Sequence, residues 1–105
     1  MSVWIAQYRD DFDYTMANEY GPLQIITYRE VPRSFCGPEW DGFAEDIRKF
    51  MKEYEGENDY ILFSGNPQQM IVIAAVMAEN HTQIRILKWM KRERRYVPLH
   101  VPLCL

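Results

Sequence analysis

Two short stretches of the chain hold residues whose types and spacing could support chemistry, and each follows an apolar, strand-like run. They consist of Tyr8, Arg9, Asp10 and Asp11 in the first stretch and of Ser64, Gly65 and Asn66 in the second. An arginine can bind a phosphate, and the N–H groups at the start of a helix favour an anion. Together the two stretches predict a site for a small anionic ligand, such as a nucleotide or another phosphate-bearing molecule.

Each stretch also has a purely structural interpretation. Ser64–Asn66 can be a tight strand-to-helix turn in which the asparagine caps the helix that follows. The chain has no P-loop lysine and no G-x-G-x-x-G pattern at this turn. Asp10 and Asp11 can cap a short helix or, with Asp13, hold Mg²⁺ for phosphoryl transfer or nucleotide hydrolysis.

A different kind of site is predicted at a basic turn near the C-terminus. Four of the five residues in 91–95 are basic, namely Lys91, Arg92, Arg94 and Arg95, and Trp89 precedes them. Basic residues interleaved with an aromatic can contact nucleic-acid phosphates or an acidic protein patch, or can simply protect a solvated hairpin tip. The formal net charge of −3 argues against general binding to nucleic acid.

A long loop is the second candidate for contact with a partner. The segment Glu30–Trp40 contains two prolines and a glycine, and it exposes Phe35 beside Arg33. Long loops in compact domains tend to be functional, and an aromatic next to an arginine is typical of an interaction surface. The predicted partner-binding residues are therefore Phe35, Arg92, Arg94 and Arg95, and a homodimer is compatible with the sequence.

Neither a metal nor a cofactor is expected from the other reactive side chains. His81 and His100 are isolated, because neither has a second ligand at helical or hairpin spacing. Cys36 and Cys104 lie far apart, which is compatible with a disulfide but more typical of two free thiols in a reducing cytosol. No serine or cysteine stands in a known nucleophile motif.

The composition is that of one globular domain over residues 1–105. Hydrophobic residues make up 48% of the chain, which is enough for a core. The first residues lack the pattern of a secretory signal. The longest apolar run, Met70–Ala78, is far shorter than the ~20 residues that span a bilayer. We therefore expect a soluble cytoplasmic protein that does not associate with a membrane.

The residue patterns alternate between strands and helices. Strands are predicted at Val3–Tyr8, Leu23–Val31 and Tyr60–Gly65, and the last of these lacks alternation, as a strand covered on both faces does. Helices are predicted after Asp10 and Asp11, at Glu39–Tyr54 and at Pro67–Asn80, the last being apolar nearly all round and therefore largely buried. An antiparallel hairpin is predicted at Gln83–Met90 and Tyr96–Leu103, with its prolines at a sheet edge.

Strands that alternate with helices predict an α/β fold. We expect a small flavodoxin-like or Rossmann-like three-layer sandwich whose sheet is mostly parallel. Numbered along the chain, the strands should lie in the order 2-1-3-4, with an antiparallel C-terminal strand at the edge. In such sheets a ligand binds beyond the carboxyl ends of the strands where the order reverses, here between the first and third strands. Both chemistry-bearing stretches follow those two strands.

Three parts of the sequence read "DYTMANEYG" (residues 13–21), "DYILFSGNP" (residues 59–67) and "RILKWMKRERRYVPLHV" (residues 85–101). Together they resemble a group of small accessory proteins encoded by bacteriophages. The resemblance lies in the run of strand, Ser-Gly turn, apolar helix and basic hairpin, and it brings no catalytic motif. It implies an accessory protein that acts inside an infected bacterium, where such proteins often bind a host protein or sequester a small molecule.

Three functions are compatible with these observations. The first is a non-enzymatic binding protein that modulates a host protein, as the basic hairpin and the aromatic loop indicate. The second is a protein that binds or sequesters a small phosphate-bearing ligand at the strand reversal. The third is an enzyme of phosphoryl transfer or hydrolysis that uses Asp10, Asp11 or Asp13, although no complete catalytic constellation is visible.

Overall fold

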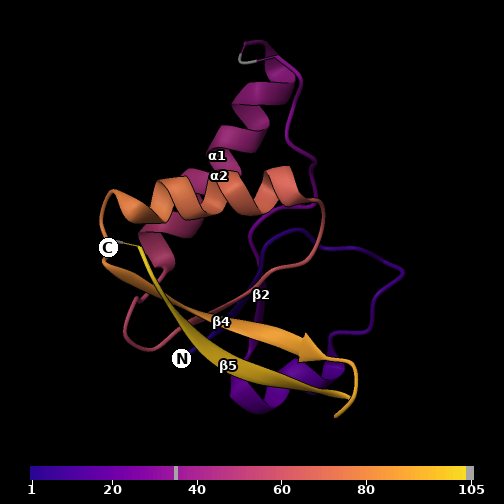
Figure 1. Cartoon of the computed structure of the whole chain (residues 1–105). Coiled ribbons are helices and arrows are strands. Elements are labelled where there is room, and N and C mark those ends of the chain that lie inside the picture. The colour runs from indigo at the N-terminus through magenta and orange to yellow at the C-terminus, as the bar shows by residue number, and fades with distance from the viewer. Residues whose placement is uncertain (35, 104–105) are drawn as a thin grey trace.

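The computed structural model describes residues 1–34 and 36–103 and shows a mixed α/β domain (Figure 1). Its elements are β1 (Val3–Ile5), the 3-10 helix η1 (Thr15–Tyr20), β2 (Leu23–Ile25), α1 (Pro38–Glu53), β3 (Tyr60–Leu62), α2 (Pro67–Ala78), β4 (Gln83–Met90) and β5 (Arg95–Pro102). The five strands form one sheet in the order β2-β1-β3-β4-β5. All neighbours are parallel except β4 and β5, which confirms the predicted strand order and the antiparallel C-terminal edge.

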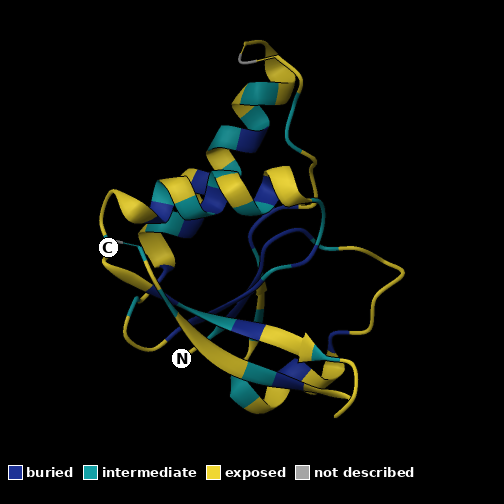
Figure 2. Ribbon diagram, in the orientation of Figure 1, coloured by how far each residue is buried: buried dark blue, intermediate teal, exposed yellow. Residues whose placement is uncertain are grey.

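The sheet has a core on each face because helices cover both faces. On one face, Trp4 of β1 packs with Phe43 and Phe50 of α1 and with Ile73 of α2. On the other face, strand residues pack against Ala17 of η1. This explains why β1 and β3 are buried throughout, while the outer strands and helix surfaces are exposed (Figure 2).

The first helix differs from the prediction. Asp10 and Asp11 do not cap it, because η1 begins only at Thr15 and is a 3-10 helix. The carboxylate that meets its first turn belongs to Asp13, whose Oδ1 accepts a hydrogen bond from the Thr15 backbone N–H at 2.9 Å. Hydrogen bonds from the hydroxyl and the backbone N–H of Thr15 lower the pKa of Asp13.

The start of α2 confirms the predicted cap in part. Asn66 Oδ1 accepts a hydrogen bond from the Gln69 backbone N–H at 3.0 Å, and Pro67 occupies the first turn. Gln69 does not complete a capping box, because its Oε1, which would accept from the Asn66 N–H, has no hydrogen-bond partner among the described residues, while its Nε2 donates to the carbonyl of Arg29 at 3.1 Å. Gln69 is thereby fully buried and ties α2 to the segment after β2.

The expectation that α2 is largely buried is wrong. Its buried residues are Gln69, Ile73 and Met77, which form a single stripe at four-residue spacing. Ile71, on another side of the helix, is 67% exposed. The sequence is apolar nearly all round, but in the described chain only this stripe is fully covered by the residues packed around it.

Three strands are shorter than predicted. β1 ends at Ile5, although the Ala6 N–H still donates to Leu62 O at 3.0 Å. β2 contains only Leu23–Ile25, although the Ile26 N–H still donates to Ile5 O at 2.9 Å. Beyond it, the Thr27 hydroxyl donates to Asp46 of α1 at 2.8 Å. β3 ends at Leu62, so the long hairpin strands extend beyond it.

Candidate functional site

The carboxyl ends of β1 and β3 are joined by side chains at the predicted site. The Ser64 hydroxyl donates to the Gln7 carbonyl at 2.7 Å, and its oxygen lies 2.6 Å from the Tyr14 hydroxyl. Gly65 has a φ of +105°, and Gln7 packs so closely against it that a Cβ there would meet Gln7 Oε1 at 2.2 Å. Part of the strand reversal is therefore filled by protein atoms.

A small hollow remains open beside this contact. Its volume is about 330 Å³, and its lining consists of Gln7, Arg9, Asp10, Asp11, Glu30 and Asn66. Arg9 Nη2 lies 3.2 Å from Asp11 Oδ2, so the charge of the arginine is already partly compensated. Since Asp10 and Glu30 add two further carboxylates, the local field of the hollow favours a cation or a neutral group over an anion.

The predicted ligand residues thus separate into two groups. Arg9, Asp10, Asp11 and Asn66 line the small hollow, whereas Ser64 and Gly65 line a larger pocket to which Arg9 also contributes. Tyr8 lines neither, because its half-buried ring packs against those of Tyr14 and Tyr28, with centroid distances of 5.5 and 5.3 Å.

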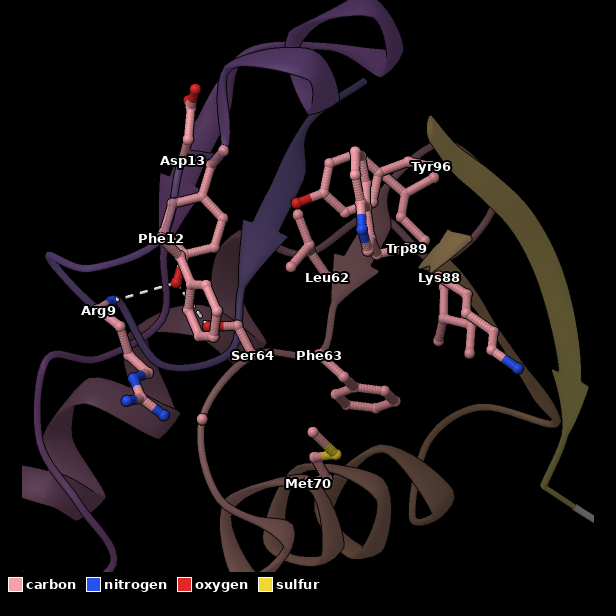
Figure 3. Close-up of a pocket in the computed structure, with 14 residues that line it drawn as sticks. Arg9, Phe12, Asp13, Leu62, Phe63, Ser64, Met70, Lys88, Trp89 and Tyr96 are labelled. Carbon is pink, nitrogen blue, oxygen red and sulfur yellow. Dashed lines mark hydrogen bonds between the residues drawn. The ribbon is translucent and has the colours of Figure 1, made fainter. Parts of the chain in front are cut away.

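The larger pocket has a volume of about 670 Å³ and lies where β3 ends beside the longer strand β4 (Figure 3). Figure 3 shows Arg9 and Phe12 on one side of the opening, Lys88 and Trp89 on another, and Phe63 with Met70 below. Leu62, Ile86, Leu87 and Tyr96 add to its mainly apolar lining, which also includes Asp13 and Tyr14. A concave, apolar surface with few polar groups is the usual form of a binding site.

Sequence reasoning missed this pocket. Its residues come from the loop after β1, the turn after β3, the start of α2, and β4 and β5. The sequence predicts a hairpin strand at Gln83–Met90 but does not indicate that Trp89 remains 41% exposed. The residue pattern extends the third strand to Gly65, so it gives no sign that β3 ends at Leu62 beside a β4 that continues to Met90.

The basic turn forms the exposed tip of the β4–β5 hairpin. Residues 91–94 are the turn itself, and Arg94 adopts a positive φ of 52°. Within residues 1–34 and 36–103, none of Arg92, Arg94 and Arg95 takes part in an ion pair. The fourth predicted partner-binding residue, Phe35, lies outside the described residues.

Reactive groups elsewhere are scattered. In the described part of the chain, no three His, Cys, Asp or Glu side chains gather as potential metal ligands. His81 stacks edge-on against Tyr54 with ring centroids 5.5 Å apart, and Cys36 is an exposed free thiol. Cys104 lies outside the described residues, so its pairing stays a prediction. No helix within residues 1–34 and 36–103 has the length and apolar character needed to cross a membrane.

Comparison with other proteins supports a phage origin. No curated protein and no solved structure matches the chain. A family model described as "Phage Pam3 gp32-like protein" matches residues 2–103. This match spans nearly the whole chain, confirms the resemblance to small phage-encoded proteins and indicates a phage accessory protein. The chain therefore belongs to the phage Pam3 gp32-like protein family.

Proposed function

We propose that this phage protein is a non-enzymatic accessory protein that modulates a host protein, to which it binds through the β4–β5 hairpin. The observation that carries this proposal is the exposed cluster Arg92, Arg94 and Arg95, which has no acidic partner within the described residues. Charged groups that pair with nothing in their own chain are available to an acidic surface of another protein.

The distribution of charge supports the same function. The whole chain is acidic, with a formal net charge of −3, while four of the five residues in 91–95 are basic. Such a local patch orients an approaching acidic protein and raises the association rate, whereas the net negative charge weakens non-specific attraction to nucleic acid. The corresponding site of action is the cytoplasm of the infected cell.

Capture of host proteins tests this proposal. Tagged wild-type protein is incubated with a lysate of the phage's host, and retained proteins are quantified by mass spectrometry. The test variant carries Arg92→Glu, Arg94→Glu and Arg95→Glu. The matched control carries Arg48→Glu, Lys49→Glu and Lys52→Glu on α1, and these three residues are also exposed. Both variants change the net charge equally, so only the position of the change differs.

The expected result is a host protein that wild type and the α1 control retain and that the hairpin variant loses by tenfold or more. Circular dichroism must show that both variants fold. Equal loss in both variants would mean that net charge, not the hairpin, governs capture. Equal retention in all three proteins would contradict a partner-binding role for Arg92, Arg94 and Arg95.

A second candidate function is binding of a small phosphate-bearing ligand at the reversal between β1 and β3. Arg9 and the helix cap Asn66 line the hollow of about 330 Å³ at this position and favour such a ligand, while the carboxylates of Asp10, Asp11 and Glu30 in the same lining oppose an anion. We propose that the sheet is a reduced flavodoxin-like or Rossmann-like sheet, in which this is the place for a ligand. Phosphate and a nucleoside monophosphate should then raise the melting temperature of wild type but not of Asn66→Asp.

A further inference from the structure

We propose that the pocket beside β4 receives an extended segment of the partner protein, which inserts one aromatic or large aliphatic side chain and pairs with the backbone of Trp89. The segment carries acidic residues next to this anchor. The inference rests on the proposed partner-binding function and adds the chemistry of what is bound. Three features support it: an open strand edge, an apolar pocket beside that edge, and the charged residues around both.

The open edge follows from the pairing of β4 with its two neighbours. The parallel pairing with β3 ends at Leu62 and Leu87, so residues 88–90 extend past β3. On the other side, Leu87 lies opposite Pro98, which has no N–H to donate. Leu87 therefore directs its backbone N–H and C=O away from β5. In an antiparallel pair every second residue points its backbone groups the same way, so Trp89 also directs its N–H and C=O away from β5.

The backbone N–H and C=O of Trp89 consequently face the space beyond the end of β3. Among the described residues, no backbone carbonyl in the surrounding turns and loops accepts a hydrogen bond from this N–H. An extended peptide that lies in line with β3 can accept from this N–H and donate to this C=O, as in strand addition to an exposed sheet edge.

The other free edges of the sheet are poorer templates. The outer edge of β5 lacks N–H donors at Pro98 and Pro102, and prolines are a common protection against unwanted strand pairing. The outer edge of β2 contains only three residues. The edge at Trp89 has no such protection and opens directly onto an apolar pocket.

The pocket is suited to a side-chain anchor. Phe12 and Trp89, on different sides of its opening, are 50% and 41% exposed, and Phe63 and Met70 line it further in (Figure 3). A volume of about 670 Å³ accommodates a large side chain together with part of its backbone. Anchors of this kind, usually aromatic, supply most of the binding energy in protein interfaces.

The charges around the opening indicate what flanks the anchor. Three charged residues line the pocket: Arg9 is paired with Asp11, and Asp13 accepts hydrogen bonds from Thr15, whereas Lys88 forms no ion pair within the described chain. The hairpin tip with its unpaired arginines follows Lys88 closely in sequence and makes that side of the opening positive. Acidic residues beside the anchor would meet Lys88 and the tip, while basic residues there would be repelled.

A display library of random nine-residue peptides, selected against the immobilised protein, tests this inference. The expected selection is for peptides with an aromatic or large aliphatic residue next to Asp or Glu. A synthetic peptide with the enriched sequence is then titrated against wild type, Phe12→Ala and Tyr28→Ala. Tyr28 is a matched control, since it is an aromatic residue that is 67% exposed and does not line the pocket.

Phe12→Ala should weaken peptide binding by tenfold or more, while Tyr28→Ala should leave it within twofold of wild type. Amide hydrogen exchange measured by NMR then reports the strand pairing. Saturating peptide should slow exchange at the Trp89 N–H by tenfold or more. The Lys88 N–H, which faces β5, should change little.

Four results would overturn the inference: no enrichment above an uncoated surface, enrichment of basic sequences, equal effects of the two alanine variants, or binding that leaves the Trp89 amide unprotected. The proposed function can fail separately. If the hairpin arginines remain essential for host-protein capture while the peptide tests fail, the partner binds the hairpin without entering the pocket. If peptide binding succeeds but capture is independent of the arginines, the proposed role of the hairpin tip is wrong.

Discussion

The hydroxyl oxygens of Tyr14 and Ser64 lie 2.6 Å apart, and this contact joins the loop after β1 to the end of β3. Ser64 uses its proton to bond the Gln7 carbonyl, so Tyr14 donates to Ser64 and in turn accepts from the Arg9 backbone N–H at 3.2 Å. The chain of bonds is buried at one side of the candidate pocket. It fixes the loop that carries Phe12.

Ser64→Ala should reduce the free energy of unfolding by about 1–3 kcal/mol, because the Tyr14 hydroxyl and the Gln7 carbonyl both lose a buried partner. Urea denaturation followed by tryptophan fluorescence measures the change. Tyr14→Phe removes the same hydroxyl contact from the other side. If the two effects simply add in the double variant, the hydroxyls are not coupled.

Gly65→Ala should be more destabilising than Gly37→Ala. Both glycines have a positive φ, of 105° and 92°, so both substitutions cost about 1–3 kcal/mol of backbone strain. A Cβ at Gly37 meets no atom of the described residues within 4 Å, whereas one at Gly65 lies 2.8 Å from the Cβ of Gln7, which cannot rotate away. The difference between their melting temperatures isolates this clash, and equal melting temperatures would show that the turn shifts freely.

Asp59→Ala should cost at least about 2 kcal/mol of stability, because a buried carboxylate joins the N-terminal stretch around β1 to the turn that follows α1. Its oxygens accept from the backbone N–H groups of Ser2 and Glu55, at 2.8 and 2.9 Å, and from Trp4 Nε1 at 3.0 Å. Chemical denaturation measures the loss. Glu57→Gln, at an exposed carboxylate nearby, should change stability by less than about 0.5 kcal/mol.

Tyr54→Phe should make the protein more resistant to alkali. The buried Tyr54 hydroxyl has no hydrogen bond of normal geometry to any described residue, and burial raises its pKa to about 12. Above pH 10 the unfolded chain releases this proton while the folded chain keeps it, so the wild type loses stability as pH rises, by up to roughly 1.4 kcal/mol per pH unit. The phenylalanine variant lacks this loss.

Urea denaturation of both proteins at pH 8, 9, 10 and 11 measures this difference. The two should have similar stability at pH 8, because the hydroxyl makes no bond that the variant loses. The gap should widen only above pH 9. Burial also raises the pKa of Tyr96, but that residue is unchanged in the variant, so its effect cancels. Parallel stability curves across the whole range would contradict the assignment to Tyr54.

Features that depend on neighbouring residues could be predicted from the sequence. The helical spacing of Phe43, Ile47 and Phe50 identified α1 because those side chains share one face. Asn66 and Pro67 marked the start of α2 through local cap chemistry. Alternating strands and helices then restricted the sheet to few arrangements, which is why the strand order was also predictable.

Features that depend on distant partners were decided only by the tertiary structure. The sequence marked Ser64 as a candidate ligand residue, but its bonds run to Tyr14, 50 residues away, and to Gln7, 57 residues away. The sequence of α2 is apolar on every side, yet how much of it is covered depends on what packs there. The large pocket arises because β3 stops at Leu62 while β4 continues to Met90, and the relative ends of two strands are set by the packing of the whole sheet.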